Sequence, residues 1–159
     1  MRRAAYRFLT TWVLDAPQER VFDAIHEVER WPEWWHGVES VVRLDGGGND
    51  GVGSVYRHRW RSILPYTVGF DMETSRIERP LVLEGRATGE LEGFGRWGFA
   101  ERDGRTVVTY EWDVRTTRPW MNLLAPVGRP VFAWSHNVVM RRGGDCLARR
   151  LGVRILENR

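Results

Sequence analysis

The chain has 159 residues, with 24 basic and 21 acidic side chains that give a net charge of +3. Hydrophobic residues make up 42% of the chain and charged residues 28%, which is typical of a folded globular protein and excludes extensive disorder. This length predicts one domain over residues 1–159. The single cysteine, Cys146, excludes an intrachain disulfide and a zinc site built from several cysteines, and it favours a reducing, cytoplasmic location.

Two features of the composition bear on function. Every basic residue is an arginine, but the arginines are spread along the chain, so no concentrated surface for nucleic acid is expected. The chain also contains 9 tryptophans. Large aromatic rings often line concave apolar sites, so this excess is the first indication of a small-molecule site.

No apolar run approaches the ~20 residues needed to span a bilayer, and the sequence therefore predicts a soluble protein.

The N-terminal part predicts a strand followed by two short helices. Residues 8–14 form the expected strand, and the apolar residues between 21 and 28 then recur at helical spacing. Pro32 interrupts this pattern, so a second short helix is expected there. Three tryptophans surround this proline: Trp31, Trp34 and Trp35. They have three interpretations, namely core packing against the sheet, the mouth of a pocket, and transient contact with a membrane interface; core packing is favoured.

From residue 38 onward the hydrophobic period changes to two. Turn residues recur at regular intervals in this region, which is typical of a meandering antiparallel sheet. The clearest strand covers residues 108–115, where Val108, Tyr110, Trp112 and Val114 share one face. The whole pattern predicts a strongly curved sheet of about seven strands.

A long C-terminal helix of about 23 residues is expected to begin near Gly128, after a proline-rich connection that holds one short turn at residues 120–124. Gly143 lies near the middle of the predicted buried face, where it permits close approach of another element or leaves space for a ligand. Three apolar residues face the other way: Val131, Trp134 and Val138. Either the turn at 120–124 covers them or they form a subunit contact.

A strand, two short helices, an antiparallel sheet and a long terminal helix follow one another in the order of an α+β helix-grip fold. The sequence resembles the START-like superfamily of polyketide cyclases, dehydrases and lipid-transport proteins, which is related in fold to the birch-pollen allergen. The segments that carry the resemblance are residues 15–22, 31–35, 110–112 and 130–140. The resemblance implies an apolar pocket between the curved sheet and the long helix. It supplies no shared catalytic motif.

The alternating pattern assigns a mainly aromatic set of residues to the concave side of the sheet and the facing side of the helix. We expect these residues to line the ligand cavity: Tyr56, His58, Trp60, Phe70, Met72, Leu83, Trp97, Phe99, Tyr110, Trp112, Phe132, His136 and Met140. Such a lining, apolar with a few polar points, is typical of small-molecule sites of ~300–1,000 Å³. For each ring taken singly, simple core packing is the alternative.

His58 and His136 are the candidate catalytic residues, because the pattern places each on an apolar face and on opposite walls of the expected pocket. Burial would lower their pKa values and favour the neutral imidazole, which donates one hydrogen bond and accepts another. This arrangement suits the binding of a carbonyl or hydroxyl group, and it also suits acid/base catalysis on a polyketide. The alternative for each is a structural histidine bonded to a neighbouring group.

Other motifs are not supported by their context. Residues 93–98 spell G-x-G-x-x-G, but they lie in a predicted strand with no helix after it, so no dinucleotide site is expected. His26 and His36 have no metal-ligand spacing, and no metal or cofactor is predicted. Cys146 falls on the buried face of the long helix, where an inert thiol is expected.

The leading hypothesis is a protein that binds, and in one version transports or presents, a hydrophobic small molecule such as a lipid or polyketide. The alternative is a polyketide aromatase/cyclase or dehydrase that uses His58 or His136 as general acid/base. Nucleic-acid binding through arginine ranks below both. The oligomeric state, monomer or homodimer, is left open.

Overall fold

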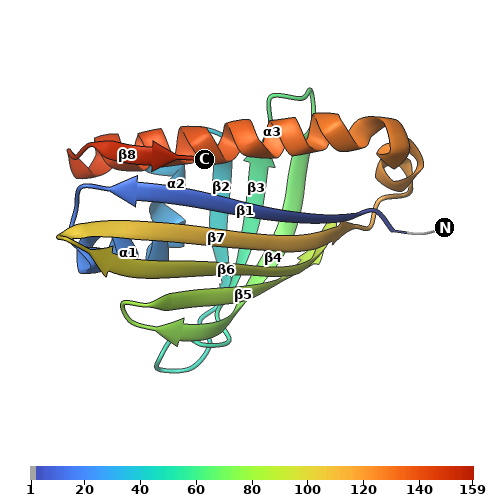
Figure 1. Ribbon diagram of the computed structural model, residues 1–159. Helices are drawn as coiled ribbons and strands as arrows, with labels where there is room; N and C mark the ends of the chain where they lie inside the picture. The colour runs from blue at the N-terminus through green and yellow to red at the C-terminus, as the bar shows by residue number, and fades with distance from the viewer. Residues whose placement is uncertain (1–2) are drawn as a thin grey trace.

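The computed structural model describes residues 3–159, so the first two residues of the predicted domain lie outside the described residues (Figure 1). In chain order the elements are β1 (Ala5–Leu14), α1 (Gln18–His26), η1 (Val28–Arg30), α2 (Trp31–Trp34), β2 (Val38–Asp45), β3 (Val55–Arg61), β4 (Thr67–Glu78), β5 (Val82–Gly89), β6 (Leu91–Arg102), β7 (Arg105–Thr116), α3 (Pro119–Leu151) and β8 (Ile155–Asn158). This order confirms the predicted α+β helix-grip fold. The G-x-G-x-x-G stretch lies within β6, as its alternating context indicated.

Within residues 3–159 the strands form an eight-stranded sheet in the order β2-β3-β4-β5-β6-β7-β1-β8, with antiparallel neighbours throughout. The sheet curls strongly: in Figure 1, β2, β3 and β4 run across the direction of β1, β6 and β7. The long helix α3 lies across the open side of this curl. A curled sheet and one helix therefore enclose the interior of the protein.

The sheet contains one strand more than the approximate count from sequence. Strand β8 pairs with the end of β1, and the chain continues this pairing through mutual backbone hydrogen bonds between Thr11 and Arg159. The strand has four residues, which is too short to show a two-residue period in the sequence. It covers only part of the outer edge of β1.

Helix α3 has 33 residues and is longer than predicted, because it continues through Pro126 and Pro130. Each proline removes one backbone donor from the helix, which we interpreted from sequence as a break between a short turn and the long helix. Both prolines are exposed, so the carbonyl groups that they leave without a partner are close to water. The helix bends near this end instead of stopping (Figure 1).

The two halves of α3 are packed very differently. Its C-terminal half lies on a large core in which Trp12, Trp35 and Phe22 are almost fully buried. Gly143 and Gly144 make this packing possible, since a Cβ on Gly143 would overlap the Trp35 indole and one on Gly144 would lie 2.9 Å from Trp12 Nε1. The Trp35 indole donates a hydrogen bond of 3.2 Å to the Val139 carbonyl. The absence of a side chain at Gly143 thus allows the Trp35 indole to pack directly against the backbone of α3.

The tryptophans of the α2 region belong to the same core. Trp31, Trp34 and Trp35 are all buried, so these rings pack against the sheet and are not available to a membrane interface. On α3 the outcome is the opposite: Val131 and Trp134 are exposed, so the turn at residues 120–124 does not cover them.

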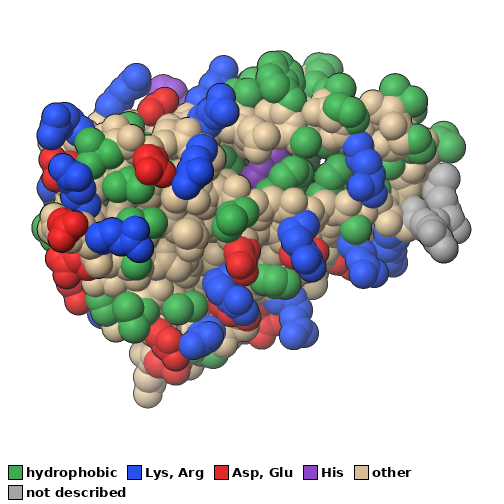
Figure 2. All heavy atoms as spheres, in the orientation of Figure 1, with side chains coloured by type: hydrophobic (Ala, Val, Ile, Leu, Met, Phe, Trp, Pro, Cys, Tyr) green, Lys and Arg blue, Asp and Glu red, His purple; other side chains and the backbone are tan. Residues whose placement is uncertain are grey.

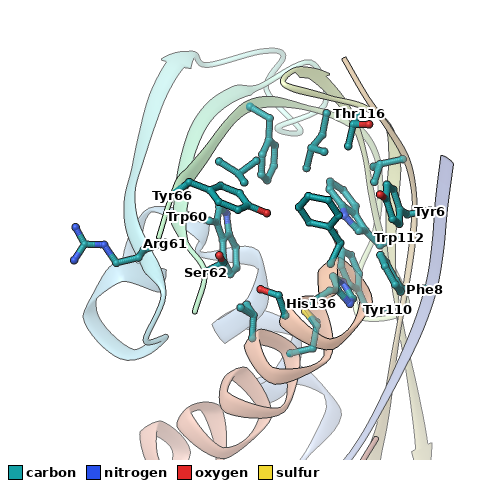
Figure 3. A pocket seen from close by; sticks show the side chains of 18 of the residues that line it. Tyr6, Phe8, Trp60, Arg61, Ser62, Tyr66, Tyr110, Trp112, Thr116 and His136 are labelled. Atoms are coloured by element: carbon teal, nitrogen blue, oxygen red, sulfur yellow. The ribbon is translucent and has the colours of Figure 1, made fainter. Parts of the chain in front are cut away.

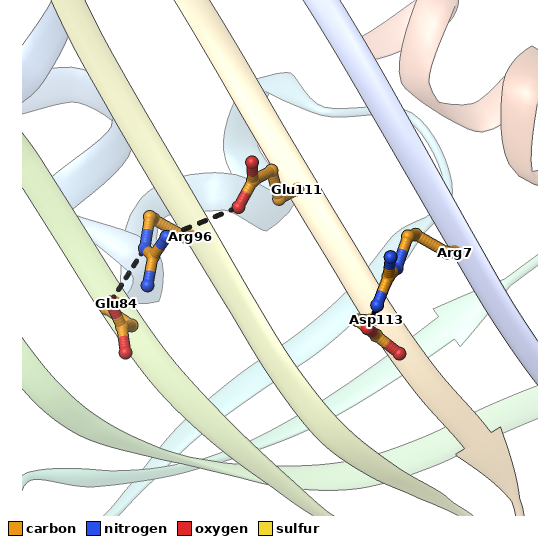
Figure 4. A network of polar contacts seen from close by, with 5 residues as sticks. All are labelled: Arg7, Glu84, Arg96, Glu111 and Asp113. Atoms are coloured by element: carbon orange, nitrogen blue, oxygen red, sulfur yellow. Dashed lines mark hydrogen bonds and ion pairs between the residues drawn. The ribbon is translucent and has the colours of Figure 1, made fainter.

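The convex face of the sheet carries ion pairs. Arg96 on β6 bridges Glu84 and Glu111 on the neighbouring strands, and Arg7 contacts Asp113 at 2.9 Å (Figure 4). Most of these groups are open to solvent, where such a pair contributes about 0–1 kcal/mol. These ion pairs show that the convex face of the sheet is exposed to solvent. Among residues 3–159, no helix is long and apolar enough to cross a membrane.

The packing of α3 on Trp35 generates a prediction about stability. Gly143→Ala should lower the free energy of unfolding by about 3 kcal/mol, because the added methyl group overlaps the buried Trp35 indole, which is held by its hydrogen bond to the Val139 carbonyl. Gly46→Ala is the matched control, since the atom nearest to its added methyl group, Arg43 Cζ, lies 4.0 Å away. Urea denaturation of both variants measures the difference. Equal stabilities would contradict the account of this contact.

Candidate functional site

The less filled half of the interior contains a cavity of about 170 Å³, which we call the α3 cavity. It lies between the N-terminal half of α3 and the concave side of the sheet (Figure 3). Its wall is mostly aromatic and aliphatic, with hydroxyl groups at a few points. The lining residues come from β1, α2, β3, β4, β6, β7, α3 and the loop between β3 and β4.

Many of the residues predicted from sequence meet in this cavity. Those that line it are Trp60, Phe70, Trp97, Tyr110, Trp112, Phe132, His136 and Met140. Others line a second space of about 310 Å³ beneath α1 and η1, which we call the α1 cavity: Tyr56, His58, Met72 and Leu83. Phe99 lines neither cavity and packs edge-on against Phe22. The expected single pocket is therefore divided into two.

A set of rings separates the two cavities, and we call it the aromatic wall. Its members line both spaces: Trp31, Trp60, Phe70, Trp97 and Tyr110. The rings are in mutual contact, with Tyr110 stacked on Trp97 at a centroid distance of 4.0 Å and Trp31 meeting Trp60 edge-on at 6.1 Å.

Several lining residues were not identified from the sequence. Tyr6 and Phe8 extend the inward face of β1, and their two-residue spacing is a signal that would have assigned them to the cavity. Tyr66 lies in the connection between β3 and β4 and carries no such signal. Its hydroxyl group points into the cavity in Figure 3.

The cavity contains a small number of polar atoms. Burial raises the pKa of Tyr66 to about 12, and it also raises that of Tyr6, so both phenols are protonated donors at neutral pH. Within residues 3–159 the Tyr6 Oη and His136 Nδ1 atoms are buried without a hydrogen-bond partner. Buried polar atoms that are left without a partner cost free energy, and a ligand with matching groups would relieve that cost.

His136 is held on α3 by an aromatic stack. Its ring lies parallel to Phe8 at a centroid distance of 4.0 Å. Burial lowers the pKa of His136 to about 4, against the smaller opposing effect of a hydrogen bond with Asn137. The imidazole is therefore neutral at physiological pH. The surface between α3 and β1 is hollowed on the face shown in Figure 2, and a histidine side chain is visible there.

His58 has a different environment. Its side chain is buried and stacks on Phe70 at 5.2 Å, and its Nδ1 accepts a long hydrogen bond of 3.4 Å from the Trp60 indole. Burial lowers its pKa to about 4, and Asp71 opposes this shift weakly. Because His58 lines the α1 cavity and His136 the α3 cavity, the two histidines do not face one another across a single pocket. Among residues 3–159, no three His, Cys, Asp or Glu side chains cluster to hold a metal ion.

The sequence profile of the polyketide cyclase/dehydrase and lipid-transport family matches residues 14–139. No match was found among the curated proteins.

Three solved structures illustrate the similarity in fold. The Zhui aromatase/cyclase from Streptomyces sp. R1128 has a TM-score of 0.73 at 14% identity over 91% of this chain and 92% of that one. TTHA0849 from Thermus thermophilus has a TM-score of 0.72 at 17% identity over 92% and 99%. The di-domain aromatase/cyclase BexL of the BE-7585A biosynthetic pathway has a TM-score of 0.70 at 19% identity over 90% of this chain. The match covers 48% of BexL, so this chain spans about half of its length. At these identities the likeness concerns the fold.

The two buried histidines predict a pH dependence of stability. Each pKa falls from 6.5 to about 4 on folding, so the unfolded chain binds more protons between these values. The stability that follows from burying the neutral rings is complete above pH ~6.5 and is lost as the pH falls toward about 4. Each histidine should remove about 2 kcal/mol between pH ~7 and ~5.

Urea denaturation at several pH values measures this effect. The His58→Gln/His136→Gln variant should show a much flatter dependence over that range, because neither glutamine titrates. A variant with the same slope as the parent would mean that the two imidazoles are protonated as easily in the folded chain as in the unfolded one.

Proposed function

This chain belongs to the polyketide cyclase/dehydrase and lipid-transport family, and we propose that it binds a hydrophobic, ring-containing small molecule in the α3 cavity. The observation that carries the proposal is a partly open space lined mostly by aromatic rings, beside a core in which Trp12, Trp35 and Phe22 are almost fully buried. An apolar group that enters such a space leaves water, which is favourable in free energy.

The cavity volume limits what enters first. A space of ~150 Å³ is enough for benzene, so the α3 cavity of about 170 Å³ accepts a group the size of one ring. A larger polyketide or lipid would extend past the aromatic wall into the α1 cavity, which adds about 310 Å³. The ligand class that fits is therefore an elongated apolar molecule with a ring at the end that enters the α3 cavity.

The polar atoms define a complementary feature of the ligand. The phenols of Tyr6 and Tyr66 are hydrogen-bond donors. His136 Nδ1 has no hydrogen-bond partner within residues 3–159. A carbonyl oxygen would accept from a phenol, and a hydroxyl group would bond to either kind of partner. One carbonyl or hydroxyl group on the ring is the expected recognition element.

We propose catalysis of a polyketide cyclisation as the second candidate, with His136 exchanging the proton. The observation that favours it is an unbonded imidazole nitrogen in the wall of a cavity that the phenols of Tyr6 and Tyr66 also line. Binding ranks first because an imidazole with a pKa of about 4 is a weak base at neutral pH, whereas efficient acid/base groups titrate near the working pH. His58 ranks below His136 as the proton-exchanging group, because its Nδ1 already accepts a hydrogen bond from the Trp60 indole.

A cavity-filling variant tests the binding proposal. Val68 lines the α3 cavity and is half-buried, so Val68→Phe should insert a ring into the space without breaking the core. We expect the Kd for the neutral fluorescent probe N-phenyl-1-naphthylamine to rise about tenfold, because the ring competes with the probe for the same volume.

The control is Leu9→Phe, which adds the same ring at an exposed position on β1, and it should bind the probe as the parent does. Thermal unfolding of both variants verifies that they are folded. Equal probe affinities in the parent and both variants would place the probe outside the α3 cavity and count against the proposal.

His136→Gln separates the two candidate functions. Glutamine keeps a donor and an acceptor but cannot exchange a proton near neutral pH, so probe affinity should change less than about threefold in either case. If the chain is a cyclase, the variant should form no aromatic product from a linear poly-ketone that the parent converts, as followed by ultraviolet absorbance. Retained conversion would exclude His136 as the proton-transfer group.

A further inference from the structure

An apolar stripe runs along the outer side of the N-terminal half of α3. We call it the α3 stripe, and it consists of Trp120, Leu123, Leu124, Val127, Val131 and Trp134. The steps of three and four residues place neighbouring members on one side of the helix. Val127 is 82% exposed, Leu123 67% and Trp134 57%, although each side chain is large and apolar. Figure 2 shows apolar side chains gathered over this half of α3.

The stripe is unusual because the helix has its apolar side chains on both faces. The inward residues of the same turns, Met121 and Phe132, line the α3 cavity. Several outward residues, above all Val127 and Leu123, have most of their surface in water, and exposing apolar side chains to water is unfavourable in free energy. A contiguous exposed apolar patch of this kind marks an interaction surface.

The charge around the stripe indicates the partner. Residues 114–144 contain no acidic residue and five arginines. Arg141 and Arg142 are exposed on the turns that follow the stripe. Arg129 projects toward β1, with its guanidinium 5.4 Å from the Tyr6 ring centre. Within residues 3–159 none of these three arginines forms an ion pair with an acidic side chain.

We propose that the α3 stripe docks on the surface of an anionic phospholipid bilayer. The apolar side chains enter the boundary between headgroups and acyl chains, and Arg141 and Arg142 contact the phosphates. Trp120 and Trp134, at the two ends of the stripe, are the residue type that favours this boundary. The helix lies on the bilayer and does not cross it, since no helix among residues 3–159 is long and apolar enough to do so.

A second copy of the chain fits the same face less well. Face-to-face pairing would bring together two segments that each carry arginines and no acidic residue. Like charges at an interface oppose association, whereas an anionic surface attracts both segments. Charge therefore favours the bilayer over a dimer.

The docking surface is continuous with the lining of the α3 cavity, and in this respect the inference rests on the proposed function. Trp120 of the stripe meets Tyr66 edge-on at 5.4 Å, and Tyr66 in turn contacts the inward ring of Phe132 at 6.2 Å. A docked helix would bring this end of the cavity to the lipid surface. An apolar ligand would then pass between bilayer and cavity without crossing bulk water.

Vesicle cosedimentation tests the inference. The parent chain should bind vesicles of phosphatidylcholine mixed with phosphatidylglycerol, bind vesicles of phosphatidylcholine alone much more weakly, and lose affinity as sodium chloride is raised. Leu123→Gln/Val127→Gln should weaken binding to the mixed vesicles by about tenfold, because two apolar side chains no longer enter the boundary.

The matched control is Leu9→Gln/Leu81→Gln, which removes one exposed leucine from β1 and one from the turn before β5, and it should bind as the parent does. Absence of binding to the mixed vesicles, or equal binding by the two double variants, would overturn the inference. A dimer in sedimentation velocity that only Leu123→Gln/Val127→Gln dissociates would also overturn it, in favour of a second copy. Probe binding without vesicles reports the proposed function separately, because neither Leu123 nor Val127 lines the cavity.

Discussion

The contact between α3 and the indoles of Trp35 and Trp12 determines how the rest of the molecule is arranged. Gly143 and Gly144 let the helix approach these rings closely, which anchors its C-terminal half to the sheet. The N-terminal half extends from this anchor across the open side of the curled sheet, where it has fewer buried residues. The α3 cavity beneath that half and the exposed α3 stripe above it are therefore two consequences of the same anchor.

The aromatic residues have two different roles inside the curl. Near α1 and α2 they fill the core, and Trp12 and Trp35 are almost completely buried. Farther along the sheet they face empty space and form the walls of the two cavities. Rigid rings keep such a space open, since they cannot bend into it as long aliphatic chains can. The rings of the aromatic wall line both cavities.

Much of the fold follows from the sequence, because the hydrophobic period changes from helical spacing to two and back in the helix-grip order. The strand that contains Tyr110 and Trp112 was assigned from its alternation alone, and both residues line the α3 cavity. The division of the pocket did not follow from the sequence, since periodicity gives the face of a residue but not its neighbours in space. For this reason His58 and His136 were expected to face one another. The contribution of Tyr66, which lies outside any periodic element, also required the structure.

Occupation of the α3 cavity is most directly tested by nuclear Overhauser effects between bound N-phenyl-1-naphthylamine and methionine methyl groups labelled with ¹³C. Met121 and Met140 line the α3 cavity and Met72 lines the α1 cavity, so the three methyl groups report the two spaces separately. The account predicts contacts from the probe to the Met121 and Met140 methyl groups. A saturated complex in which the probe contacts neither of them would contradict it.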